Sequence, residues 1–315
     1  MSHQCKICNN TVGNIPYTGR EMMFGTGDEF SYFKCPVCGC LQIEEVPDSL
    51  DKYYPTDYYS YRQKGTSSWE TFRDSLIRSS AQIGIDRVLP IHLLSHKYAK
   101  YRRYKQLWLK GVDKKSSLLD IGSGKGVLLN MLHVFGYENL TGIDPYIDPD
   151  VSYDNGVRIF KKDIYNLDKQ YDFVMLHHAF EHIAEPHKSI SRLSEIVTDN
   201  GRILIRIPVV DGYAWRKYQM NWFQVDAPRH LFLYSVKSMH MLAEEHGLEI
   251  ESIVYDSEYR QFTISEGYVK GISASEMRSP GVWEKYRYKR KAVQLNLSKD
   301  GDQACFILRK KEIER

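Results

Sequence analysis

Two pairs of cysteines near the N-terminus carry the clearest chemical signal in the sequence. Cys5 and Cys8 form one C-x2-C pair, and Cys35 and Cys38 form a second. Each pair places two thiolates on one tight turn, and two such turns can supply the four sulfur ligands of a tetrahedral Zn²⁺. Because four thiolates leave no open coordination position, we expect a structural rather than a catalytic metal. The alternative is a set of reduced free thiols, and the neighbouring Cys40 is expected not to be a ligand.

A glycine-rich loop, Asp120–Gly126, indicates a second site. Its G-x-G-x-G spacing differs from the dinucleotide pattern G-x-G-x-x-G, and it lacks the G-x-x-x-x-G-K-[ST] of a phosphate-binding loop. Asp144, at the end of the next predicted strand, can accept both hydroxyls of a ribose. Asp163-Ile164 follows the third strand, where the acid could meet an adenine amino group. The alternative interpretation is a cluster of turn glycines with surface acids.

The elements that must position these residues alternate between strands and helices from Ser117 onward. This alternation predicts an α/β domain with a parallel sheet covered on both faces. The predicted strands are 118–121, 140–144, 157–160, 171–177, 202–207, 250–255 and 304–308. The predicted helices are 127–135, 186–196 and 235–246, and Asp199–Gly201 is predicted to be a turn.

These motifs resemble those of the class I S-adenosylmethionine-dependent methyltransferases. The resemblance covers about 115–310 and rests on Leu118–Gly126, Gly142–Pro145, Asp163-Ile164 and His177–His182. It implies a Rossmann-like seven-stranded sheet with the last strand antiparallel, and S-adenosylmethionine above the C-terminal strand ends. A cleft lined by acids and aromatic faces would suit the cationic sulfonium. The residues that the resemblance assigns to the cofactor are Asp120, Gly122, Ser123, Gly124, Asp144, Pro145, Asp163, Ile164, His177 and Glu181.

The N-terminal cysteines, followed by a Tyr-rich linker and this core, are similar to the zinc-containing sugar methyltransferases. Members of that group act on nucleotide-linked deoxysugars in natural-product and polysaccharide pathways. Their second motif, His-Glu-His-Leu-x-Tyr, is matched here by Pro228–Ser235, which keeps the second His as His230. Pro228 and Arg229 replace the first His and the Glu, and the chain ends without the extra C-terminal domain of the carbon-methylating members. These departures favour methylation at a hydroxyl.

Four residues are candidates for the chemistry of proton removal. An imidazole can accept a proton at neutral pH, so His230 and His182 are each predicted as the general base. A structural or substrate-contacting role is the alternative for both. Asp226 and Arg229, which flank His230, could orient it or bind a substrate hydroxyl or phosphate. A plain surface ion pair is equally compatible with their spacing.

The sequence divides into three predicted parts. Residues 1–48 form a zinc-ribbon-like module, 49–114 a Tyr-rich linker with helices, and 115–315 the methyltransferase domain with insertions at 209–234 and 257–301. The basic, aromatic helix predicted at 96–110 could contact a phosphate-bearing or lipid-linked glycan or a membrane surface. A solvated helix face is the simpler interpretation.

Composition limits the partners and the compartment. The net charge of +3 is mild for a nucleic-acid binder, so nucleic acid is not the expected partner. The chain lacks a visible signal peptide and any apolar run that could span a bilayer, so a cytoplasmic location is expected. The expected acceptor is a small molecule or glycan, including a nucleotide-linked or lipid-linked sugar. The alternatives are a methyltransferase for RNA or another small molecule, and a non-enzymatic zinc-knuckle module with a vestigial cofactor fold.

Overall fold

The computed structural model describes residues 4–54, 109 and 111–312. The chain divides into two compact units, of which the first contains residues 1–55, 178–194 and 205–315. The second contains residues 56–177 and 195–204. The predicted helices between 68 and 108, most of the Tyr-rich linker, and nearly all of the basic helix at 96–110 lie outside the described residues.

The central sheet has eight strands in the hydrogen-bonded order β11-β12-β9-β8-β4-β5-β7-β6. Their bounds are β4 Ser117–Ile121, β5 Asn139–Ile143, β6 Val151–Ser152, β7 Arg158–Phe160, β8 Tyr171–His177, β9 Val197–Pro208, β11 Leu248–Tyr255 and β12 Gln303–Lys310. Seven of them match the expected Rossmann-like sheet, and the antiparallel pairing of β12 with β11 matches the expected last strand. The eighth, β6, is a two-residue edge strand paired antiparallel to β7, too short to leave a sequence pattern.

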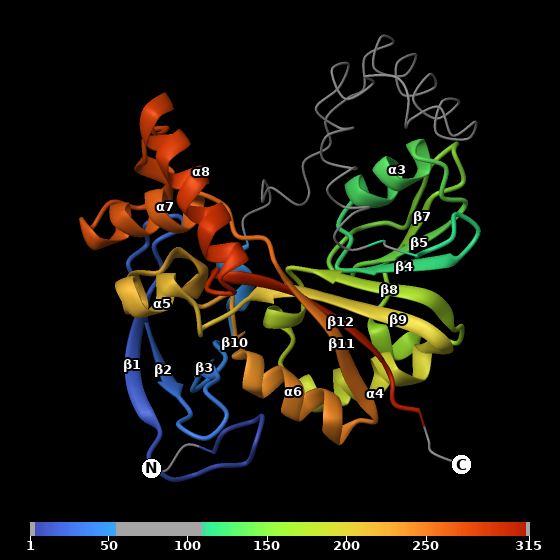
Figure 1. Cartoon of the computed structure of the whole chain (residues 1–315), viewed down its shortest axis with the longest axis horizontal. Helices are drawn as coiled ribbons and strands as arrows, with labels where there is room; N and C mark the ends of the chain where they lie inside the picture. Colours follow the sequence, from blue (N-terminus) through green and yellow to red (C-terminus); the bar gives the residue numbers. More distant parts are fainter. Residues whose placement is uncertain (1–3, 55–108, 110, 313–315) are drawn as a thin grey trace. The chain divides into compact units, whose positions relative to one another are not determined.

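In the second unit, four parallel strands have their C-terminal ends at the same edge of the sheet. β8 and β5 flank β4, and β7 pairs with β5, all in parallel register. Helix α3, Val127–Val134, begins after Gly126 and lies against this sheet (Figure 1). Gly126 has a φ of +70°, a conformation that glycine adopts without the usual steric penalty.

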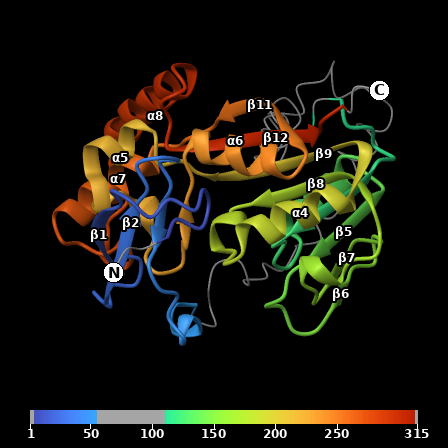
Figure 2. The same ribbon diagram turned by 90° about the horizontal axis from the view of Figure 1, so that it is seen from below.

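The first unit contains the remaining helices and a second sheet. The helices are α4 Pro186–Ile196, α5 Tyr213–Tyr218, α6 Val236–Glu245, α7 Arg260–Val269 and α8 Val282–Leu297, with the last two residues of α4 belonging to the second unit. Helix α6 starts at a capping box between Ser235 and Ser238, and it lies along β11 (Figure 2). No helix among the described residues is long and apolar enough to cross a membrane.

The second sheet joins the N-terminal module to a distant segment. Its order is β1-β2-β3-β10, with β1 Ile15–Arg20, β2 Glu29–Lys34, β3 Leu41–Ile43 and β10 Phe232–Leu233. β10 belongs to the predicted insertion 209–234 and pairs antiparallel with β3. The motif that contains His230 is therefore held by the cysteine-rich module.

The predicted turn at Asp199–Gly201 is wrong, because these residues are part of β9. The chain folds tightly here: a Cβ on Gly201 would lie 2.7 Å from Val197 Cγ2 and 2.9 Å from the Asp172 carbonyl oxygen. The glycine marks a close approach of neighbouring backbone rather than the end of a strand.

Candidate functional site

The edge at which the parallel strands of the second unit end collects most of the predicted cofactor residues. Ile121, the last residue of β4, pairs with Ile143 of β5 and with Leu176 of β8, and Ile143 pairs with Phe160 of β7. The residues that follow or end these strands therefore share one edge, as expected for ligand binding in an open parallel sheet. These residues are Gly122, Ser123, Gly124, Asp144, Pro145, Asp163, Ile164 and His177.

The glycine loop is fixed by backbone hydrogen bonds and by Asp144. Gly122 N and Ser123 N donate to the Ile143 carbonyl at 2.9 and 3.2 Å. Asp144 is buried, and its carboxylate accepts hydrogen bonds from Gly124 N and Tyr146 N, both at 2.9 Å. A carboxylate can accept about four hydrogen bonds, so both oxygens keep capacity for ligand hydroxyls.

Asp120 is the other buried acid of this edge, with 3% of its surface exposed. Burial, together with the charge of Asp144, raises the pKa of Asp120 to about 8. Burial also raises the pKa of Asp144. Two buried acids with raised pKa values favour a cationic ligand, whose charge would stabilise their ionised forms.

The remaining predicted cofactor residues lie in different surroundings. Pro145 is exposed, and Asp163 is exposed and accepts a hydrogen bond from Tyr165 N at 3.0 Å, which caps a short 3-10 helix, η5 Ile164–Asn166. His177 ends β8 and is half-buried. Glu181 belongs to the first unit, where it lies among the predicted catalytic residues.

Glu181 is the buried centre of a group that also contains the half-buried His178 and His182 and the buried His230. Glu181 sits in the short 3-10 helix η6, Phe180–His182, and has no exposed surface. Its Oε1 lies 3.2 Å from His178 Nδ1 and 3.9 Å from His230 Nε2, whereas Oε2 lacks a hydrogen-bond partner among the described residues. Burial alone would raise the pKa of Glu181, but the hydrogen bond from His178 and the charges of the three imidazoles lower it to about 2.

The two predicted bases face each other and are held in the same way. Their rings are 4.8 Å apart in an edge-to-face arrangement. His182 Nδ1 lies 2.8 Å from the Arg229 carbonyl oxygen, and His230 Nδ1 lies 2.7 Å from the Gln224 carbonyl oxygen. Since a carbonyl only accepts, each Nδ1 is the donor, and Nε2 is the nitrogen through which each neutral imidazole would take up a proton. Burial, followed by the charge of His230, lowers the pKa of His182, so its neutral form is favoured.

Arg229 and Asp226 form a buried ion-pair network. Arg229 is fully buried and contacts the carboxylates of Asp226 and Glu21 through Nη2 at 2.5 and 2.9 Å. Its Nη1 donates to the Tyr53 carbonyl at 3.2 Å. The expectation of a plain surface ion pair is wrong, because both charges of the pair are buried. Asp226 also lies 3.8 Å from His230 Nε2.

Sequence reasoning missed three polar residues that support this group. Glu21 has no exposed surface and accepts hydrogen bonds from the backbone N–H groups of Met23, Phe24 and Thr26 as well as from Arg229. His178 has a φ of +53°, and its Nε2 lies 2.6 Å from Arg206 Nη1. Arg206 in turn donates to Asp256 at 2.7 Å. No local sequence motif identifies these three residues. The two adjacent histidines that follow a predicted strand are the sequence feature that marks the position of His178.

The four predicted metal ligands converge. The Sγ atoms of Cys5, Cys8, Cys35 and Cys38 all lie within 4.8 Å of one another. The Sγ–Sγ distance is 3.5 Å both for Cys5 and Cys38 and for Cys8 and Cys35. Ligands at about 2.3 Å from a tetrahedral zinc lie about 3.8 Å apart, so the donor set fits Zn²⁺. The hydrogen bond from the Cys38 thiol lowers the pKa of Cys5 to about 5, which favours a thiolate there.

A protein-family model described as a methyltransferase domain matches residues 92–253. The matched segment is 162 of the 315 residues. The chain belongs to this methyltransferase family. It is an S-adenosylmethionine-dependent methyltransferase, and the non-enzymatic alternative is set aside. The search among curated proteins found no match.

Several solved structures match this chain at low identity. One is a chain from the complex of the Haloferax volcanii Trm112 methyltransferase activator with its methyltransferase, with 16% identity and a TM-score of 0.45, covering 75% of this chain and 98% of that one. Another is a SAM-dependent methyltransferase from Thermotoga maritima, with 15% identity and a TM-score of 0.40, covering 68% and 96%. A third is the apo form of mycolic acid cyclopropane synthase CmaA1, with 17% identity and a TM-score of 0.44, covering 69% and 90%.

Proposed function

We propose that this methyltransferase transfers the methyl group of S-adenosylmethionine to a hydroxyl of a sugar or glycan. The sequence resembles the zinc-containing sugar methyltransferases in two separate motifs, and this resemblance supports a sugar or glycan as the acceptor. One motif is the pair of C-x2-C turns, and the other is the segment 226–235 around His230. A nucleotide-linked or surface-polysaccharide sugar is the acceptor that we favour.

The observation that carries the proposal is the pair of facing imidazoles, each with its Nδ1 hydrogen-bonded to a backbone carbonyl. A sugar hydroxyl is a weak acid, so its proton must be accepted while the oxygen attacks the methyl group. His230, with its Nδ1–H held by the Gln224 carbonyl, is our first candidate for that base. His182 has the same arrangement on the Arg229 carbonyl and is the second candidate.

The surrounding charges would stabilise the imidazolium that forms. Glu181 Oε1 and Asp226 Oδ2 lie 3.9 and 3.8 Å from His230 Nε2. Both carboxylates are buried, so their charges act through a medium of low dielectric constant. Arg229 would act as a positioning residue that fixes Asp226, and His178 as one that fixes Glu181.

Oxygen rather than carbon is the favoured acceptor atom. The carbon-methylating members have His and Glu where this chain has Pro228 and Arg229, and the Arg229 guanidinium is fully engaged with buried carboxylates. Because a guanidinium stays protonated and has no acceptor, Arg229 cannot replace a Glu that accepts a proton, which leaves a single imidazole from that motif.

The structural zinc would serve the same segment. The cysteine-rich module supports residues 229–235 through the Glu21–Arg229 ion pair, the Tyr32 hydroxyl on the His230 carbonyl at 3.0 Å, and the Ser235 hydroxyl on the Cys38 carbonyl. Loss of the metal would therefore loosen the segment that carries the base.

In the second unit, Asp144 would bind the ribose hydroxyls and the glycine loop would receive the amino-acid part of the cofactor. Asp163 would face the adenine, and Asp120 would face the positive charge. When bound, S-adenosylmethionine supplies a methyl group already activated for displacement. The buried acids suit that cation, as their raised pKa values indicate.

The acceptor can be found by incubating the protein with methyl-labelled S-adenosylmethionine and panels of nucleotide sugars and glycans, followed by mass spectrometry. We expect label in a sugar and none without protein. Label appearing only in RNA or in a non-carbohydrate small molecule would overturn the acceptor class.

A further inference from the structure

Helix α8, Val282–Leu297, exposes a stripe of apolar side chains along one side. Trp283, Tyr286, Val293 and Leu297 are 85%, 56%, 57% and 81% exposed. Their spacing of three, seven and four residues places them on one side of an α-helix, and Val282, 82% exposed, extends the stripe. Large apolar side chains gathered on one exposed helix face indicate an interaction site.

The opposite face anchors the helix within the first unit. Tyr288 stacks on Phe262 with ring centroids 4.9 Å apart, and its hydroxyl donates to Glu266 at 2.7 Å. Lys291 Nζ lies 2.7 Å from the Tyr213 hydroxyl, and Ala292 is buried. Because one side is fixed on α5 and α7, which lie beside α8 in Figure 1, the exposed apolar side chains lie on the other side.

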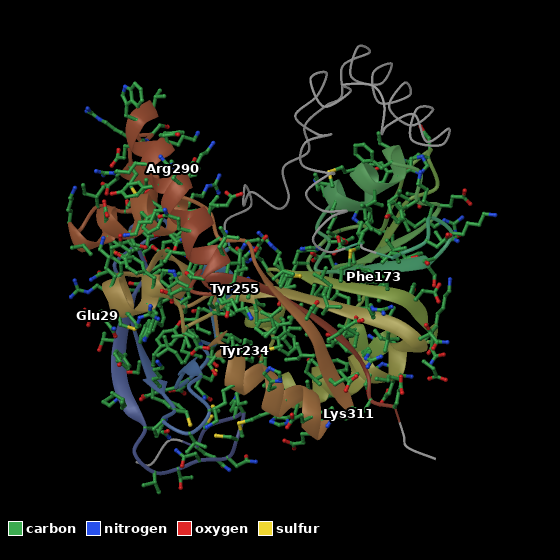
Figure 3. The ribbon with its side chains drawn as sticks, in the orientation of Figure 1. Glu29, Phe173, Tyr234, Tyr255, Arg290 and Lys311 are labelled. Carbon is green, nitrogen blue, oxygen red and sulfur yellow. The ribbon has the colours of Figure 1, made fainter. Side chains whose placement is uncertain are left out.

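Basic residues border and interrupt the stripe. Arg287 and Lys289 are exposed on its two sides, and Arg290 is exposed in the middle of it (Figure 3). The helix has one acid, Glu284, against five basic residues. An outward surface that combines Trp, Tyr and Leu with Arg and Lys has the composition of a helix lying in the headgroup region of a membrane.

We propose that α8 binds the surface of an anionic phospholipid bilayer. The apolar side chains would enter the interface between headgroups and acyl chains, Trp283 and Tyr286 would lie at headgroup level, and the three exposed cations would pair with lipid phosphates. A second copy of this chain fits less well, because an antiparallel or parallel α8 pair would bring like-charged residues such as Arg290 into the contact.

This inference goes beyond the proposed function and is tested separately from it. Bilayer binding requires neither S-adenosylmethionine nor an acceptor, so failure of the one does not imply failure of the other. If both hold, the acceptor class narrows to sugars presented at a membrane, such as lipid-linked glycans.

The test is co-sedimentation of the full chain with vesicles of phosphatidylcholine alone or with one part in three of phosphatidylglycerol. We expect binding to the anionic vesicles, much weaker binding to the neutral ones, and loss of binding as salt increases. The double variant Arg287→Gln/Arg290→Gln should bind the anionic vesicles about 25-fold more weakly, since each cation contributes about fivefold. Leu297→Glu should weaken binding by about tenfold through loss of apolar burial.

The matched control is Val12→Glu, which places the same charge on a residue of the N-terminal module that is 75% exposed. It should bind as the wild type does. Trp283→Phe should still bind, but the shift of tryptophan fluorescence to shorter wavelength that accompanies vesicle binding should be lost. Equal binding of the wild type to both vesicle types, or of the wild type and the double variant to anionic vesicles, would overturn the proposal. So would a dimer in light scattering that Leu297→Glu dissociates, since the occupant would then be a second copy.

Discussion

Cofactor binding should release a proton from Asp120. The pKa of this buried carboxyl is raised to about 8, so at pH 7 only about one-tenth of the free protein has Asp120 ionised. S-adenosylmethionine has a net positive charge and is expected to bind the ionised form. Preparing that form costs about 1.4 kcal/mol at pH 7 and about twice as much at pH 6. The affinity should therefore rise about tenfold per pH unit between pH 6 and 8 and level off above.

The raised pKa of Asp120 also affects folding, with the opposite dependence on pH. In the unfolded chain Asp120 ionises near its ordinary value of 3.8, whereas in the folded protein it stays protonated up to about pH 8. The folded state thus binds more protons across this window, and Asp120 makes the protein less stable as pH rises from about 4 to 8. Asp120→Asn should flatten that part of the stability profile.

Isothermal titration calorimetry in two buffers of different ionisation enthalpy measures the release directly. We expect nearly one proton released per cofactor at pH 7 in the wild type and a clearly smaller release in Asp120→Asn. Some release should remain, because burial also raises the pKa of Asp144. The control Asp163→Asn changes an exposed acid of the same edge and should weaken binding without changing the release. A release that is undiminished in Asp120→Asn would refute the assignment of Asp120 to the cofactor's charge.

Three further predictions concern the metal, the buried ion pair and the base. The purified protein should hold about one zinc per chain by elemental analysis. The variant Cys8→Ser should lose the zinc and unfold more easily, whereas the control Cys40→Ser should keep it. Arg229→Gln should lower the free energy of unfolding, measured in urea, by about 3–5 kcal/mol because it leaves buried carboxylates unpaired. The control Arg20→Gln, which breaks an exposed ion pair, should lower it by less than about 1 kcal/mol. Equal losses would contradict a stabilising role of the buried ion-pair network. His230→Ala should reduce turnover about 10²–10⁴-fold with cofactor affinity nearly unchanged in calorimetry, and full turnover in this variant would move the role of base to His182.

The order of strands and the cofactor edge could be predicted because they depend on local patterns. A buried run ending in glycines, as at Leu118–Gly126, specifies a strand and the loop after it, and parallel pairing then brings every such loop to the same edge. The convergence of Cys5, Cys8, Cys35 and Cys38 was predictable for the same reason, since each C-x2-C pair is one turn. The eight-stranded sheet departs from the expectation at β6, where two residues pair with an edge strand, and at β9, which includes the predicted turn at Asp199–Gly201.

The surroundings of the candidate base could not be read from the sequence. Glu21 and Arg229 are 208 residues apart, and their ion pair depends on the sheet formed by β3 and β10. The two residues of β10 pair with the N-terminal module only in the tertiary fold. A strand of two residues leaves no periodic pattern in the sequence. His178 was equally hidden, because its left-handed backbone conformation orients a side chain that the strand pattern leaves undefined.

The most direct test of the central claim is carbon NMR of the product formed with ¹³C-methyl S-adenosylmethionine and the acceptor identified by mass spectrometry. We predict a single new methyl signal at the chemical shift of a methoxy group, with a long-range coupling to a ring carbon of the sugar. A labelled methyl bonded to carbon or nitrogen, or one on a non-carbohydrate acceptor, would contradict the account.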